Sequence, residues 1–236
     1  MIQKPVVVIL GNADNIGCLT ARAFAAQGAV IAMLNNDRAA GDRMMGSLPG
    51  GNHLHVVGQL DHAADLASFA GLVDTLYGRV DELICCEDAG VMVPHLQCSA
   101  RMRMAMLLEG IFVPEASIVN MASRSRKMTA WRRRKGEEGP SDVAACLARR
   151  DIRVNQIVLH RTLVPRIGGG TVTAAACAAA LFLCSEEAVH IHREYVVVNG
   201  RKASWRFHSR PVSSPFFLKP YLDFCAACMR PVFLYA

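Results

Sequence analysis

The sequence lacks an apolar run long enough to cross a membrane. Its longest small-residue and apolar stretch, Ala174 to Cys184, is far shorter than the roughly 20 residues that a spanning helix needs. At the start, Met1 to Pro5 lead straight into a β-branched run, which leaves no room for the charged and apolar regions of a signal peptide. We therefore expect no membrane association and a soluble, cytoplasmic protein.

The sequence also lacks a disulfide framework and a metal-binding cysteine pattern, although it has nine cysteines. Secreted disulfide-stabilised domains are smaller and denser in cysteine, so reduced thiols in core-like contexts are expected here. Cys225-Ala-Ala-Cys228 is the one pair with metal-ligand spacing, and no second pair or nearby pair of histidines completes a zinc site. We predict no metal.

Charged residues are few, at 19% against 52% apolar residues, which excludes a disordered chain. A length of 236 residues suits one α/β domain. Apolar runs bounded by glycine and polar turns alternate with helical patterns over most of the chain. The expected strands are 5–10, 29–34, 53–57, 82–86, 117–121, 152–158 and 194–198, and the expected helices are 18–27, 38–47, 63–77 and 173–184.

This alternation predicts an α/β fold with a Rossmann-type doubly wound parallel sheet, in a single domain. The rhythm stops near Ala203, so we expect a domain over residues 1–203 and a tail over 204–236. Eight of the fifteen aromatic residues lie in this tail. They either anchor a partner subunit or fold back over the chain's own sheet, and we favour the partner.

Several segments, in this order, resemble the short-chain dehydrogenase/reductase family. The opening strand and its glycine loop are similar to the family's Thr-Gly-x-x-x-Gly-Ile-Gly motif, and later segments are similar to its serine strand and its last helix and strand. The segments that carry the resemblance are Val6–Gly17, Ala21–Gly28, Ile118–Ser123, Asp151–Asn155, Ala179–Ala188 and Tyr195–Gly200. The resemblance implies a Rossmann fold, an NAD(P) cofactor and assembly into dimers or tetramers.

The cofactor-binding positions that the resemblance assigns are degenerate. Gly11, Ile16 and Gly17 are kept, but Asn15 stands at the middle glycine, where its side chain would intrude on the phosphates. At the end of the second strand, Asn35 replaces the acidic residue that holds the adenosine ribose, and an amide lacks the strength of a carboxylate. The aspartate after the third strand aligns with Gln59, and Asp61 lies two positions on. We therefore expect no bound cofactor; if the chain does bind one, we expect it to be NAD(P).

The catalytic positions that the resemblance assigns are also largely replaced. Ser123 is kept, but the Tyr-x-x-x-Lys motif aligns with Trp131 to Lys135, and the asparagine of the proton relay becomes Leu107. An indole N–H cannot shuttle a proton as a phenol does. Ser123 and Lys135 are then vestigial, unless His160 or Tyr195 supplies another acid.

Three segments are shorter than in the family pattern. They are the helix expected between Gly110 and Ser117, the stretch from Ser123 to Trp131, and the substrate loop, reduced to about Thr162–Arg166. Because this loop normally closes over the substrate, its loss removes the lid that excludes water. Together with the replaced residues, this predicts a chain without hydride-transfer activity.

Retention of the fold without the chemistry suggests a structural or regulatory subunit paired with an active short-chain dehydrogenase subunit in a hetero-oligomer. Some enzymes of this type, including dehydrogenases of hydroxyacyl-CoA thioesters, pair a working subunit with a degenerate one. Two alternatives stay open: an active but divergent NAD(P)-dependent reductase using Ser123, His160 and Lys135, and a nucleotide-sensing or interaction protein.

A basic run lies between Arg124 and Lys135, with seven cations in twelve residues. Such runs are commonly solvated faces. The functional alternatives are an acidic patch on a partner subunit, an anionic ligand such as a coenzyme A phosphate, or nucleic acid. Nucleic acid is the least favoured, because the run has a single interleaved aromatic residue, Trp131.

Overall fold

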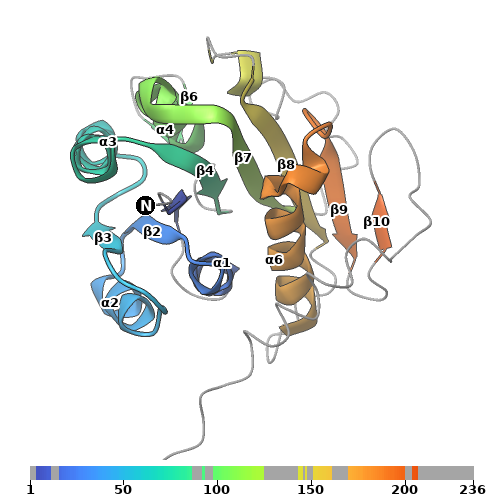
Figure 1. Ribbon diagram of the computed structural model, residues 1–236, viewed down its shortest axis with the longest axis horizontal. Helices are drawn as coiled ribbons and strands as arrows, with labels where there is room; N and C mark the ends of the chain where they lie inside the picture. Colours follow the sequence, from blue (N-terminus) through green and yellow to red (C-terminus); the bar gives the residue numbers. More distant parts are fainter. Residues whose placement is uncertain are drawn as a thin grey trace, which may run out of the picture.

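The computed structural model describes residues 4–11, 16–86, 92–93, 98–124, 143–145, 147, 151–160, 170–199 and 204–206. Its centre is an eight-stranded sheet in the order β10-β9-β8-β7-β4-β1-β2-β3 (Figure 1). Neighbouring strands pair in parallel except for β9 and β10, which are antiparallel. The strands are β1 (Val6–Leu10), β2 (Val30–Asn35), β3 (Leu54–Val57), β4 (Val80–Cys85), β7 (Phe112–Arg124), β8 (Arg153–His160), β9 (Tyr195–Asn199) and β10 (Ser204–Arg206).

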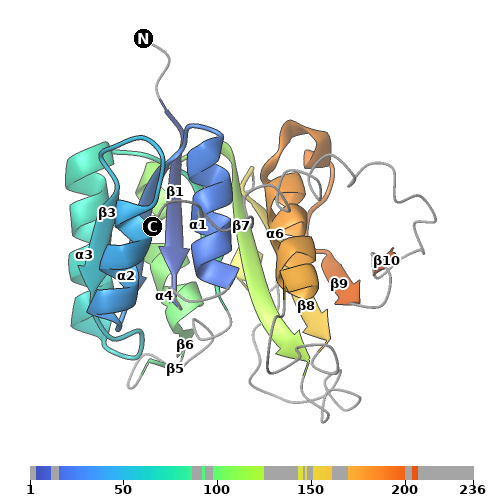
Figure 2. The same ribbon diagram turned by 90° about the horizontal axis from the view of Figure 1, so that it is seen from below.

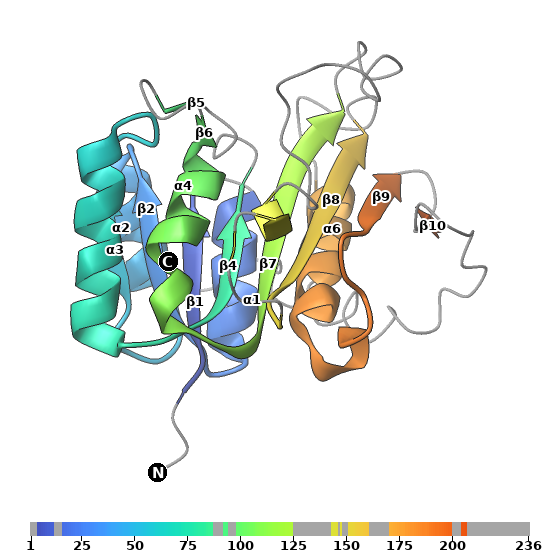
Figure 3. The ribbon, with the colours of Figure 1, turned by 90° about the horizontal axis from the view of Figure 1, so that it is seen from above.

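Helices cover both faces of this sheet (Figure 3). The described helices are α1 (Ile16–Ala26), α2 (Arg38–Gly46), α3 (Ala63–Tyr77), α4 (Ala100–Leu107) and α6 (Gly170–Cys184), with short 3-10 turns at Glu109–Ile111 and Glu186–Ala188. Beyond the main sheet, β5 (Met92–Val93) and β6 (Cys98–Ser99) form a small antiparallel ribbon. None of the helices among the described residues is long and apolar enough to cross a membrane.

The fold class expected from the sequence is confirmed: the molecule is a doubly wound α/β domain with seven parallel strands. Continuous apolar runs form the central strands because both faces of a parallel sheet are covered, and every residue of β1 and β2 is buried. The segment between Gly110 and Ser117, where the family pattern has a longer helix, is strand from Phe112 on, and the helix before it is α4.

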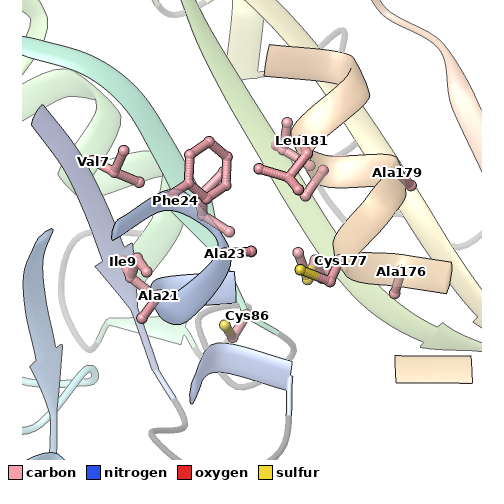
Figure 4. Packing of buried hydrophobic residues seen from close by; sticks show 14 of the residues in the cluster. Val7, Ile9, Ala21, Ala23, Phe24, Cys86, Ala176, Cys177, Ala179 and Leu181 are labelled. Atoms are coloured by element: carbon pink, nitrogen blue, oxygen red, sulfur yellow. The ribbon is translucent and has the colours of Figure 1, made fainter. Parts of the chain in front are cut away.

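Two apolar clusters fill the two sides of the sheet. The first joins the sheet to α1, α2 and α6, and Figure 4 shows Phe24 and Ala23 of α1 facing Leu181 and Cys177 of α6. The small side chains of α6 let it approach closely, since Ala174 to Leu181 are all buried. The second cluster joins the opposite face to α3, α4 and the residues Val143, Ala144 and Leu147. Figure 2 shows the strands running between these two helical layers.

The tail begins as part of this sheet. Ser204, Trp205 and Arg206 pair with Asn199, Val198 and Val197 of β9. The other aromatic residues of the tail, the pair Cys225 and Cys228, and all but the first residue of the basic run lie outside the described residues.

Gly28 ends the first helical unit in a left-handed conformation, with φ of 92°. A Cβ at this position would meet no atom, so the cost of Gly28→Ala is that of the backbone alone. We expect this variant to lose about 1–2 kcal/mol of unfolding free energy in a denaturant titration. Gly71→Ala is the control, because Gly71 lies exposed within α3 with open space around it, and it should gain up to about 1 kcal/mol. Equal effects of the two substitutions would contradict the backbone account.

Candidate functional site

The carboxyl ends of the parallel strands meet at one edge of the sheet, where doubly wound folds bind ligands. At this edge β1 is followed by Gly11, which has φ of 96° and donates its N–H to the Leu34 carbonyl at 2.9 Å. α1 then begins at Ile16, and Gly17 is buried at its first turn. Asn15 and the rest of the loop lie outside the described residues. The first glycine of the expected motif is therefore in the conformation that the turn requires.

Asn35 is the last residue of β2 at the same edge, and only 2% of it is exposed. Its side-chain oxygen accepts the Asp37 N–H at 2.8 Å and lies 3.3 Å from Nε2 of His55. Its side-chain nitrogen donates to the sulfur of Met33 at 3.3 Å. The carboxamide is thus enclosed by groups of this chain.

The imidazole of His55 connects Asn35 to the surface. Its Nδ1 lies 3.1 Å from Oδ1 of Asp42 on α2, and its side chain is 6% exposed against 62% for Asp42. The ring occupies space beside Gly41, where an added Cβ would lie 2.0 Å from the ring. The parallel register of β2 and β3, which pairs Met33 with His55, brings these groups together across 20 residues of sequence.

The loop after β3 is held by Asp65 of α3. Oδ2 of Asp65 accepts the Gln59 N–H at 2.8 Å, and Oδ1 lies 3.1 Å from Nδ1 of His62. The hydrogen bond from Gln59 first, and then that from His62, lower the pKa of the Asp65 carboxyl. Gln59 and Asp61 are the two residues that the sequence associated with the cofactor-binding aspartate after the third strand. Both lie in the loop between β3 and α3 and are exposed.

The described positions that the sequence associated with catalysis lie on three strands and one helix. Ser123 pairs with Leu159, and His160, the next residue of β8, pairs with Arg124. Tyr195 pairs with Gln156, three residues back along the strands from the level of Ser123, or about 10 Å. Of the two proposed replacement acids, only His160 is therefore at the level of Ser123.

Leu107 is the last residue of α4 and packs, partly buried, against the second apolar cluster. A hydrocarbon side chain there cannot take part in a proton relay. Trp131 and Lys135 lie outside the described residues. Within the described residues, no group of three or more His, Cys, Asp or Glu side chains could hold a metal ion.

A separate polar cluster lies near the amino ends of the strands, where β4, β7 and β8 place Glu82, Ser117 and Arg153 side by side. The Arg153 guanidinium donates to the carbonyls of Leu183, Cys184, Ser185 and Ala188 at the end of α6, at distances from 2.5 to 3.5 Å. Ser117 donates to the Leu183 carbonyl as well. This cluster terminates α6, on the edge opposite the ligand-binding one.

The Glu82 carboxyl in this cluster has an unusual environment. Its Oε2 is buried and has no hydrogen-bond partner in the structure. Burial, and then the neighbouring Asp81 charge, raise the pKa of Glu82 to about 8, against an opposing effect of Arg153. Perturbed pKa values often mark catalytic groups. Here the position at the amino edge indicates a structural role instead.

Solved structures with this arrangement are short-chain dehydrogenases and reductases. A short-chain dehydrogenase/reductase of the glucose/ribitol dehydrogenase type from Brucella melitensis is 19% identical, with a TM-score of 0.62 over 83% of this chain and 95% of that one. The 3-ketoacyl-(acyl-carrier-protein) reductase of Brucella melitensis, solved with NADH, is 21% identical, with a TM-score of 0.61 over 85% and 98%. A short-chain dehydrogenase/reductase from Serratia marcescens is 15% identical, with a TM-score of 0.65 over 84% and 98%.

At these identities the likeness shows a shared fold. No model of a known protein family matches the sequence, and no curated protein matches it either. The likeness to these solved structures establishes the fold that the resemblance implied.

The sequence analysis did not single out His55 as a functional residue. Both ring nitrogens of His55 have polar neighbours, Asp42 and Asn35. Asn35 lies at the carboxyl edge and is the residue that the resemblance aligns with the ribose-binding acid. Only the parallel pairing of β2 and β3 connects the two. The available signal is that Asn35 directly follows the expected strand 29–34 and that His55 lies in the next expected strand, 53–57.

Proposed function

We propose that this chain, which has the fold of the short-chain dehydrogenases and reductases, is a non-catalytic subunit of an NAD(P)-dependent oxidoreductase. In this proposal it pairs with an active subunit of the same fold and acts in structure or regulation, without a cofactor of its own. Leu107 carries the proposal: the resemblance aligns it with the relay asparagine, and at the end of α4 it offers only a hydrocarbon side chain. The sequence adds Trp131 in place of the acidic tyrosine.

Physical chemistry supports this combination. General acid–base catalysis contributes about 10²–10⁴-fold to a rate and needs a titratable group within hydrogen-bond reach of the substrate. Neither leucine nor tryptophan offers one. The two apolar clusters need no titratable side chain at these positions, so the fold can persist without the chemistry.

The test combines turnover with composition. The purified chain is mixed with NADH or NADPH and acetoacetyl-CoA, and the nucleotide absorbance is followed. We expect no turnover. The complex isolated with the tagged chain from its own cells is then weighed by native mass spectrometry, and we expect a dehydrogenase subunit in a fixed ratio.

Two results would remove the proposal. One is a lone homo-oligomer, with no dehydrogenase attached. The other is cofactor-dependent turnover by the purified chain that Ser123→Ala abolishes, which would select the divergent active reductase, with His160 at the level of Ser123.

A further inference from the structure

The carboxyl end of β2 is where a short-chain dehydrogenase-like chain would hold the adenosine ribose, so its polar groups test whether a dinucleotide fits. A ribose is held there through hydroxyl groups that donate to an acceptor at the strand end. In this chain the acceptor available is the side-chain oxygen of Asn35. A ribose hydroxyl fits at this position only if that oxygen can accept a further hydrogen bond.

Counting hydrogen bonds shows that the Asn35 oxygen has none to spare. A carboxamide oxygen has two lone pairs. One receives the Asp37 N–H at 2.8 Å, and the other faces Nε2 of His55 at 3.3 Å. The bond from Asp37 also fixes which end of the carboxamide is oxygen, since a main-chain N–H needs an acceptor. A ribose hydroxyl would have to displace one of these donors.

The ring of His55 is held from its other side as well. Nδ1 lies 3.1 Å from the Asp42 carboxylate, so each ring nitrogen faces an acceptor. With its proton on Nε2, the ring donates to the Asn35 oxygen. The ring therefore lies as a bridge between the buried Asn35 and the exposed Asp42, and it covers the carboxamide from the solvent side.

Two further features of α2 maintain this closure. Asp37 accepts the Ala40 N–H at 2.9 Å, so a side chain of this chain already caps the helix N-terminus beside the strand end. Gly41 leaves the space that the imidazole fills, because any Cβ there would overlap the ring. The closure is thus built from three consecutive elements, β2, α2 and β3.

We propose that His55 is a specificity-determining residue that closes the adenosine-ribose position of this fold. The imidazole ring takes the place of a ribose hydroxyl on Asn35, and the residues of this edge therefore do not fit an adenosine dinucleotide. We take from the proposed function only the premise that this edge is the nucleotide side of a short-chain dehydrogenase-like chain.

The experiment uses adenosine as the probe, because it carries both ribose hydroxyls and no phosphate. Titration calorimetry measures its dissociation constant for the full chain and for His55→Ala. We expect about tenfold tighter binding by the variant, which is the usual worth of one hydrogen bond regained. Gly41→Ala, which pushes the ring aside without removing it, should change the constant in the same direction.

Two controls separate this effect from general loosening. Gly46→Ala lies in the same helix with open space around it, and it should bind adenosine as the parent chain does. The double variant His55→Ala/Asn35→Ala should lose the gain, because the freed acceptor is gone. Circular dichroism confirms that each variant is folded.

Equal adenosine affinity of the parent chain and His55→Ala would overturn the closure, as would a gain that persists in the double variant. Either result leaves the subunit role standing. Turnover by the parent chain would remove the subunit role, and the adenosine titrations would still report on His55 alone.

Discussion

Arg153→Met lowers the free energy of unfolding by about 3 kcal/mol, which a urea titration followed by circular dichroism will measure. The guanidinium is buried, with 8% of the residue exposed, and reaches four carbonyls at the end of α6. A cation there also opposes the negative end of the helix dipole. Methionine keeps the apolar stem but leaves these carbonyls without their charged donor.

Some of those carbonyls keep another donor, which sets the size of the effect. Leu183 still accepts from Ser117, and Ala188 still accepts the Ile191 N–H at 2.9 Å. The matched control is Arg43→Met on the exposed side of α2, where a change within about 0.5 kcal/mol is expected. If Arg153→Met is equally mild, the guanidinium does not terminate α6 in the way that its hydrogen bonds indicate.

Glu82→Gln removes a pH dependence of stability and makes the protein more stable than the parent chain at pH 9, by about 3 kcal/mol. The pKa of Glu82 is raised from an ordinary 4.5 to about 8 in the folded protein, so the native state holds this proton more tightly than the unfolded state does. Stability from this group is complete below about pH 4.5 and is lost as the pH rises through about 8. The shift corresponds to about 5 kcal/mol at most, which solvent contact by part of the side chain reduces.

The measurement is a set of urea titrations between pH 5 and pH 9. The glutamine variant and the parent chain should agree within about 1 kcal/mol at pH 5 and separate as the pH rises. Glu187→Gln, at an exposed position, should follow the parent chain at every pH. Parallel curves for Glu82→Gln and the parent chain would show that the Glu82 carboxyl is ionised in the folded protein at neutral pH.

Most strands and helices of this protein follow from local sequence signals. β1 and β2 are unbroken apolar runs, and Gly28 and Gly78 end their helices in the left-handed conformation that glycine tolerates. The helix over 63–77 matches its expected bounds in full. α4 was missed because its arginine and methionine pattern is weakly periodic, and the tertiary contacts with α3 and the sheet stabilise it.

The sequence by itself determined the doubly wound fold and the chemical identity of the residues at each motif position, because periodicity and glycine spacing are local properties. Only the tertiary structure decided what those residues contact. From the sequence, Asn35 is interpreted as a weakened ribose ligand. In the structure, the register of β2 and β3 places Nε2 of His55 beside its side-chain oxygen. From the sequence, Arg153 is only a residue of an expected strand. In the structure, its guanidinium donates to the Leu183 carbonyl near the end of α6. Hydrogen-bond capacity depends on neighbours distant in sequence, and parallel pairing across crossovers determines which neighbours those are.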